Sequence, residues 1–238
     1  MSAFDIDRLL DSVISENGNL TSEDAKAIKD KQKQVIKNSG LLELIDADVD
    51  EDSVGGLDYL LDYLDKKAAI MKDVAKAEAF GVDIPKGILL VGMPGCGKSL
   101  SAKMCAKKFN GIPLLKMDMG SLQGGYVGDS ERNMREALKQ AEQAAPCILW
   151  IDEVEKGFSG TSGDNEAHTM RMLGYFLSWM QDHTRPVFVF ATANSVDNLR
   201  AEFLRAGRFD EKFVLNLPTD NERKKIFQAR LSNKKRHL

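Results

Sequence analysis

The residues best suited to chemistry form a glycine-rich segment, Gly-Met-Pro-Gly-Cys-Gly-Lys-Ser, at positions 92–99. It fits the pattern G-x-x-x-x-G-K-[ST] and lies between an apolar run at 87–91 and a stretch of helical character. Glycines permit backbone angles that side chains forbid, so successive N–H groups can surround an anion at a helix start. Lys98 would reach the outer phosphates of a nucleotide, and the Ser99 hydroxyl would bind Mg²⁺. The alternative, a glycine-rich turn with a surface lysine, does not explain the flanking strand and helix patterns. The predicted nucleotide contacts in this segment and just after it are Gly92, Met93, Pro94, Gly95, Cys96, Gly97, Lys98, Ser99 and Leu100.

A second apolar run, at 147–151, ends in the acidic pair Asp152 and Glu153. Asp152 can hold Mg²⁺, directly or through water. Glu153 can polarise an attacking water. A strand that ends in solvent-facing acids is the alternative, but the phosphate loop earlier in the chain favours the functional interpretation.

Three further polar residues are candidates for the same chemistry. Asn194 follows the apolar run at 187–191, where it would lie beside Asp152 and orient the water or the γ-phosphate; the alternative is a turn residue that caps the next helix. Arg205 and Arg208 are either the solvated end of a helix or arginine fingers supplied to a neighbouring subunit. An arginine finger contributes roughly 10³–10⁵ to the rate.

Alternating strand and helix patterns would position these residues. An order β-α-β-α predicts an α/β fold of three layers, with a mostly parallel five-stranded sheet between helices, and ligands beyond the carboxyl ends of the strands. We expect strands at 87–91, 113–117, 147–151, 187–191 and 212–215. We expect helices at 57–80, 98–109, 130–144, 166–181, 196–205 and 219–231.

The remainder of the chain predicts three parts. Residues 1–45 form a helical N-terminal segment, 46–217 the α/β core and 218–238 a further helical piece. The 33 basic and 36 acidic residues give no positive field, so nucleic acid is not an expected ligand. The apolar runs are too short to span a bilayer, and no secretory signal is visible. Three cysteines without metal spacing fit free thiols in a reducing, cytoplasmic setting.

Together these motifs resemble the AAA family of ATPases, over residues 54 to about 231. Residues 92–99 are similar to its Walker A loop, and Asp152-Glu153 to its Walker B pair. Asn194 resembles sensor 1, although the usual Ala-Thr-Asn is Thr-Ala-Asn here. The resemblance implies the P-loop NTPase fold, with ATP and Mg²⁺ as cofactors.

The resemblance also implies a site shared between subunits. Arg205 and Arg208 resemble the paired fingers of Leu-Arg-x-Gly-Arg-Phe-Asp, which act in trans within a ring, in most cases a hexamer. Asp52, Val54 and Gly55 resemble the segment that contacts adenine. The family continues into a helical lid over the nucleotide, and only one lid-like helix is expected before Leu238.

A narrower resemblance is to the hypothetical-reading-frame AAA proteins of algal plastids, cyanobacteria and other bacteria, so the plastid stroma is an alternative location. It rests on Gly124-Gly125-Tyr126-Val127-Gly128-Asp129-Ser130-Glu131 and Leu149-Trp150-Ile151-Asp152-Glu153. Tyr126, Val127 and Gly128 lie where many AAA unfoldases carry a pore loop that grips an extended polypeptide. The alternative is a tyrosine that packs locally.

The motifs predict Mg²⁺-dependent ATP hydrolysis, and the family resemblance implies that it occurs in a ring that remodels a protein substrate. A nucleotide-dependent assembly or docking module with little turnover is the alternative. A monomeric small-molecule kinase would not explain Glu153 together with Arg205 and Arg208. Cys96, inside the phosphate loop, is either a small residue that fits there or the basis of thiol-sensitive nucleotide binding.

Overall fold

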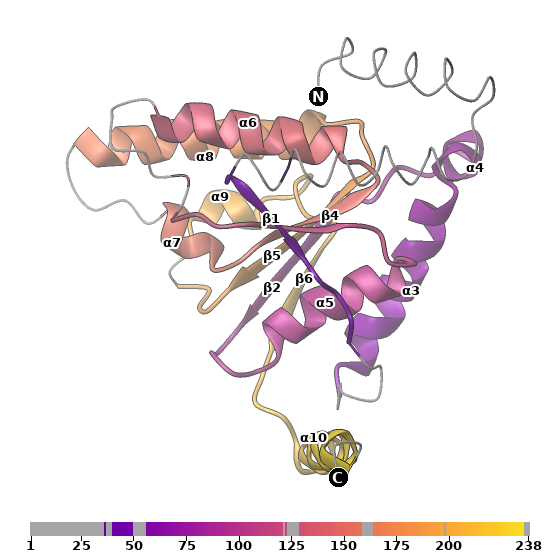
Figure 1. Ribbon diagram of the computed structural model, residues 1–238. Helices are drawn as coiled ribbons and strands as arrows, with labels where there is room; N and C mark the ends of the chain where they lie inside the picture. The colour runs from indigo at the N-terminus through magenta and orange to yellow at the C-terminus, as the bar shows by residue number, and fades with distance from the viewer. Residues whose placement is uncertain are drawn as a thin grey trace, which may run out of the picture.

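The computed structural model describes residue 36 and residues 40–49, 56–120, 122, 129–158, 164–197 and 199–235. These residues form three layers, with a central sheet between two layers of helices (Figure 1). Most of the helical N-terminal segment predicted at 1–45 lies outside the described residues. So do the predicted adenine contacts Asp52, Val54 and Gly55 and the predicted pore loop Tyr126, Val127 and Gly128.

The sheet has six strands in the order β1-β3-β4-β5-β2-β6. The strands are β1 Leu42–Ile45, β2 Gly87–Gly92, β3 Leu114–Met117, β4 Cys147–Ile151, β5 Val187–Ala193 and β6 Glu211–Leu215. All five predicted strands are present and parallel to one another. The additional strand β1 was not predicted and pairs antiparallel with β3 at the edge. The α/β class and the mostly parallel sheet are confirmed, with six strands instead of five.

Successive side chains of each strand point to opposite faces of the sheet, so a hydrophobic core forms on each face. Leu89 and Leu149 contribute to the core under α6 Asp129–Gln143 and α8 Asp164–Asp182. The other face packs against α3 Asp58–Lys72 and α5 Lys98–Lys108. Figure 1 shows the two pairs of helices on opposite sides of the sheet. Burial of both faces explains why the central strands read as continuous apolar runs.

Two predicted helices differ from the observed ones because polar side chains interrupt them. The helix expected at 57–80 is divided into α3 and α4 Val74–Ala79 at Asp73, whose side chain accepts a hydrogen bond from Lys76 N at 3.1 Å. The helix expected at 196–205 is reduced to α9 Ala201–Leu204. Ahead of it, Asp197 N donates to Ser195 Oγ at 3.1 Å, a local turn that competes with helix formation. The short helix α7 Val154–Phe158 was not predicted.

The last helix, α10 Asp220–Lys235, stands apart from the sheet and next to the C terminus in Figure 1. It contacts the start of α3, where Lys225 Nζ lies 3.3 Å from Asp58 Oδ2. A Cβ added to Gly56 would lie 2.8 Å from Glu222 Oε1, so the chain before α3 approaches α10 closely. Within the described residues, no helix is long and apolar enough to cross a membrane.

Candidate nucleotide-binding site

The phosphate loop connects the end of β2 to the start of α5. Gly95 and Gly97 have φ values of 85° and 96°, which residues with a Cβ rarely adopt. Gly92 is different, because its φ is not in the left-handed region and the glycine is required for space. A Cβ at Gly92 would lie 2.8 Å from both Cys96 Sγ and Leu215 O. The predicted backbone freedom therefore applies to Gly95 and Gly97, whereas Gly92 permits close packing against β6.

Lys98 begins α5 and is only 8% exposed. Its ammonium donates to Gly92 O at 2.5 Å, Met93 O at 3.1 Å and Asn194 Oδ1 at 2.9 Å. Three oxygens thus hold the positive charge at the mouth of the loop. Phosphate oxygens are stronger acceptors than these neutral groups, so an anion entering the loop would compete for the same protons.

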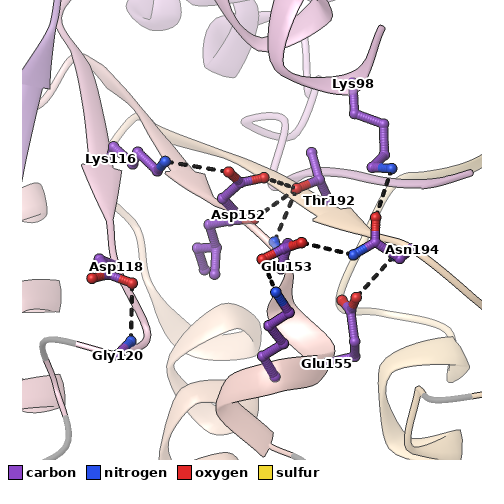
Figure 2. A network of polar contacts seen from close by, with 11 residues as sticks. Lys98, Lys116, Asp118, Gly120, Asp152, Glu153, Glu155, Thr192 and Asn194 are labelled. Atoms are coloured by element: carbon purple, nitrogen blue, oxygen red, sulfur yellow. Dashed lines mark hydrogen bonds and ion pairs between the residues drawn. The ribbon is translucent and has the colours of Figure 1, made fainter. Parts of the chain in front are cut away.

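The acidic pair at the end of β4 is organised by Thr192, which is fully buried in β5. Thr192 Oγ1 donates to Asp152 Oδ1 at 2.7 Å and accepts from Glu153 N at 3.1 Å (Figure 2). Glu153 has a φ of 51°, an uncommon conformation for a residue with a side chain. Successive side chains of a strand point to opposite faces. The turn at Glu153 departs from that alternation, so both carboxylates line one pocket.

The other oxygen of Asp152 meets a lysine from the neighbouring strand. Lys116 Nζ lies 3.2 Å from Asp152 Oδ2 and 4.7 Å from the centre of the Trp150 ring. Figure 2 shows Asp152 between Lys116 and Thr192. The lysine balances the carboxylate charge and limits the orientations that Asp152 can adopt.

Glu153 is bound on both oxygens. Asn194 Nδ2 donates to Oε1 at 2.8 Å, and Lys156 Nζ lies 2.5 Å from Oε2. The hydrogen bond from Lys156, followed by that from Asn194, holds the pKa of Glu153 below its usual range. Glu153 is therefore a carboxylate at neutral pH, which a water-activating base requires.

Asn194 joins the two halves of the site, since its side-chain oxygen accepts from Lys98 and its amide group donates to Glu153. Its backbone N donates to Glu155 Oε1 at 3.0 Å, and Glu155 is only 6% exposed. Asn194 was expected beside Asp152. Instead Thr192 occupies that place and Asn194 reaches Glu153, because Thr192 lies one residue beyond the pairing of Ile151 with Ala191.

A hollow of about 350 Å³ brings the motifs together. It is lined by Pro94, Gly95, Gly97, Lys98, Ser99, Leu100, Asp152, Glu153 and Asn194. Gly92, Met93 and Cys96 support the loop without lining this hollow. Arg205 and Arg208 do not line it either; Arg205 is exposed, and Arg208 Nη1 donates to the backbone oxygen of Glu202.

The donor set suits Mg²⁺. Ser99 contributes a hydroxyl and Asp152 a carboxylate, and hard oxygen ligands are those that Mg²⁺ prefers. Across the described part of the chain, no group of three or more His, Cys, Asp or Glu side chains forms a metal cage. Mg²⁺ commonly binds through one or two protein oxygens and the phosphates of a nucleotide, so these two ligands fit it.

The sequence reasoning missed four residues of this network. Thr192, Lys116, Glu155 and Lys156 all contact the predicted site residues. A threonine inside an otherwise apolar strand, two positions before Asn194, was an available signal for Thr192. The spacing of three between Glu153 and Lys156 was a signal for a helical ion pair.

A loop of this geometry between a parallel strand and a helix, with an acidic pair at the end of a second parallel strand that is separated from the first by one strand, defines the P-loop NTPase fold. The chain belongs to one family with that fold, because the family described as "ATPase family associated with various cellular activities (AAA)" matches residues 88–217. The narrower resemblance to AAA proteins of algal plastids is also confirmed, because the relatives described next are ycf46 proteins from algal plastids.

One relative, "Uncharacterized AAA domain-containing protein ycf46" of Gracilaria tenuistipitata var. liui, is 46% identical over 87% of this chain and 42% of its own length. Its namesake in Guillardia theta is 41% identical over 95% of the chain and 44% of its own length. "Cell division control protein 48 homolog C" of Arabidopsis thaliana is 36% identical over 76% of the chain and 22% of its own length. The chain thus spans less than half the length of these relatives.

Proposed function

We propose that the chain binds ATP with Mg²⁺ and hydrolyses it, as one subunit of a ring. One observation carries this proposal: a single pocket gathers the Lys98 ammonium, the Asp152 and Glu153 carboxylates and the Asn194 amide. Phosphoryl transfer depends mainly on positioning and charge stabilisation, which these groups provide. The name of a further relative, "ATP-dependent zinc metalloprotease FtsH" of Aster yellows witches'-broom phytoplasma, gives ATP as the nucleotide that protein uses.

Each residue has a distinct role in the proposed reaction. The loop N–H groups and Lys98 bind the phosphates, while Ser99 and Asp152 would hold Mg²⁺, which neutralises charge between the outer phosphates. Glu153 orients water and accepts its proton. Asn194 is hydrogen-bonded to both Lys98 and Glu153, so it fixes the position of the phosphate-binding lysine relative to the base.

The arginines complete the site from a neighbouring subunit. Neither Arg205 nor Arg208 lines the pocket of its own chain, and Arg205 is exposed. Exposed guanidinium groups remote from the chain's own phosphates can serve an adjacent site, where they stabilise transition-state charge. We therefore propose a homo-oligomeric ring, a hexamer by family precedent, that remodels a polypeptide.

The test is Glu153→Gln, which keeps the size of the side chain and removes its basicity. We expect ATP affinity to remain within about threefold and hydrolysis to fall by at least 10²-fold, the order that loss of a general base produces. Lys98→Met is the matched variant and should abolish binding itself. Hydrolysis by Glu153→Gln at the wild-type rate would refute the role of Glu153.

A second candidate is a nucleotide-dependent docking module with little turnover. It is favoured by the two contacts that already engage both oxygens of Glu153 and lower its pKa, since a weaker base activates water less well. The two candidates differ in their dependence on assembly. Specific activity that rises with protein concentration supports a ring with shared sites, whereas a low, constant activity supports the docking module.

A further inference from the structure

The segment that carries Arg205 and Arg208 is attached to the beginning of strand β2. Asp210 N donates to Gly87 O at 2.8 Å. In return, Asp210 Oδ2 accepts from Lys86 N at 2.9 Å and from Gly87 N at 3.1 Å. One carboxylate thus binds two successive amides, so three hydrogen bonds attach the end of the segment to Lys86 and Gly87, where β2 begins.

A lysine side chain secures the same segment from the other side. Lys86 Nζ donates to Gln181 O at 2.7 Å, at the end of α8, and to Gly207 O at 3.4 Å. Gly207 lies between the two arginines in the chain and has a φ of 88°, so it forms the turn of the segment. The ammonium therefore connects that turn to α8.

Apolar packing holds only the middle of the segment. Phe209 is 4% exposed, and its ring lies 6.5 Å from that of Phe203 in the core. Arg205 is exposed and Arg208 half-buried. The orientation of the turn between the arginines thus depends on the polar contacts that flank Phe209, together with the hydrogen bond from Arg208 to the backbone oxygen of Glu202, because the buried ring fixes position but leaves the turn free to tilt.

We propose that Lys86 and Asp210 are positioning residues for the arginines, and this rests on the proposed function of Arg205 and Arg208 in trans. Strand β2 carries the phosphate loop after its last residue, Gly92, and holds the arginine segment at its first, Gly87. Strand β2 therefore fixes the position of the phosphate loop in a subunit's own site and the position of the arginines that act in the neighbouring site.

The contacts are open to water, which makes the proposal testable without unfolding the protein. Lys86, Gly207 and Asp210 line a surface hollow of about 840 Å³. Asp83 and Lys212 line the same hollow and provide controls of matched charge. Asp210 is exposed and Lys86 half-buried, so water can replace part of the lost contacts and effects on the arginines can be measured in folded protein.

The experiment mixes two inactive proteins. Glu153→Gln supplies arginines but cannot hydrolyse ATP, and the double variant R205A/R208A supplies intact pockets but no arginines. Their mixture should regain ATPase activity. Adding Asp210→Ala or Lys86→Met to the Glu153→Gln donor should reduce the regained activity at least fivefold, since displacing a catalytic group by about 1 Å costs about 10²-fold.

Placement of the same substitutions distinguishes positioning from general damage. Asp210→Ala in the R205A/R208A acceptor should leave the regained activity unchanged, as should Asp83→Ala or Lys212→Met in the donor. Equal losses in donor and acceptor, or no loss in the donor, would overturn the proposal. If the parent mixture regains nothing, the trans role of the arginines is wrong instead.

Amide hydrogen exchange gives a second readout that does not need assembly. Asp210→Ala in the full chain should speed exchange in residues 205–209 at least tenfold while exchange in β4 stays unchanged. Unaltered exchange in residues 205–209 would contradict the claim that Asp210 holds the segment, whatever the outcome of the mixing experiment.

Discussion

Replacing Thr192 with valine tests whether one buried hydroxyl organises the acidic pair. Thr192 Oγ1 donates to Asp152 Oδ1 and accepts from Glu153 N, and the side chain is fully buried. Valine keeps the branched shape and the preference for strands. The effect of Thr192→Val therefore comes from the lost hydrogen bonds and not from a cavity.

The magnitude follows from those two bonds. A hydrogen bond to a charged group contributes about 1.5–3 kcal/mol, and one to a neutral amide about 1 kcal/mol. The Asp152 side chain is 26% exposed, so water can replace part of the lost donor. We expect a loss of about 2–3 kcal/mol in the free energy of unfolding. For a domain of this size, that corresponds to a fall in Tm of roughly 4–12 °C.

Thermal unfolding and ATPase assays on three variants check this reasoning. Thr192→Ser keeps the hydroxyl and loses only a methyl group, about 1 kcal/mol. It should retain ATPase activity, whereas Thr192→Val should lose at least tenfold. Thr184→Val, at an exposed position, should change Tm by little. If Thr192→Val melts at the wild-type temperature or hydrolyses ATP as fast as Thr192→Ser, the assigned role of the hydroxyl is wrong.

Three further predictions use the pKa directions and thiol burial. Lys156→Met removes the largest cause of the lowered pKa of Glu153, so the acid limb of the plot of kcat/KM against pH should move to higher pH. An acid limb that stays in place would contradict the role of the Lys156 ion pair. Burial lowers the pKa of His183, so the folded state favours the neutral ring and loses stability as pH falls below about 6.5. His183→Gln should therefore show a smaller fall in Tm between about pH 7.5 and pH 5.5 than the wild type, and an equal fall would count against this assignment. Iodoacetamide should modify Cys96 before Cys147, because Cys147 is fully buried and its pKa is raised to about 12. The adduct at Cys96 should weaken ATP binding. Mass spectrometry of the native protein measures the order of modification, and a nucleotide titration measures the loss of affinity.

The core of the fold was predictable because its strands are buried on both faces. The runs that became β4 and β5 are apolar at every position but one, which is the pattern of a central parallel strand. Strand β1 was not predictable in this way. It has four residues with mixed exposure and pairs only at the edge, so its formation depends on the partner β3, which is distant in the chain.

The same division holds for the site. Lys98, Asp152 and Glu153 were predicted from sequence motifs, and the fold brings all three into one pocket. The contact of Thr192 with Asp152 was not predictable, because it depends on the register of β5 against β4. Side-chain chemistry can be read from the chain, whereas the pairing of strands that selects the supporting residues is a property of the whole sheet.

The left-handed backbone at Glu153 has a consequence for how this sequence can change. That conformation costs a residue with a side chain roughly 1–2 kcal/mol, and glycine adopts it freely. Glycine at position 153 would remove this cost, but it would also remove the carboxylate and its contacts with Asn194 and Lys156. The backbone strain is thus coupled to the polar network of the pocket, and a substitution that relieves the strain also removes part of that network.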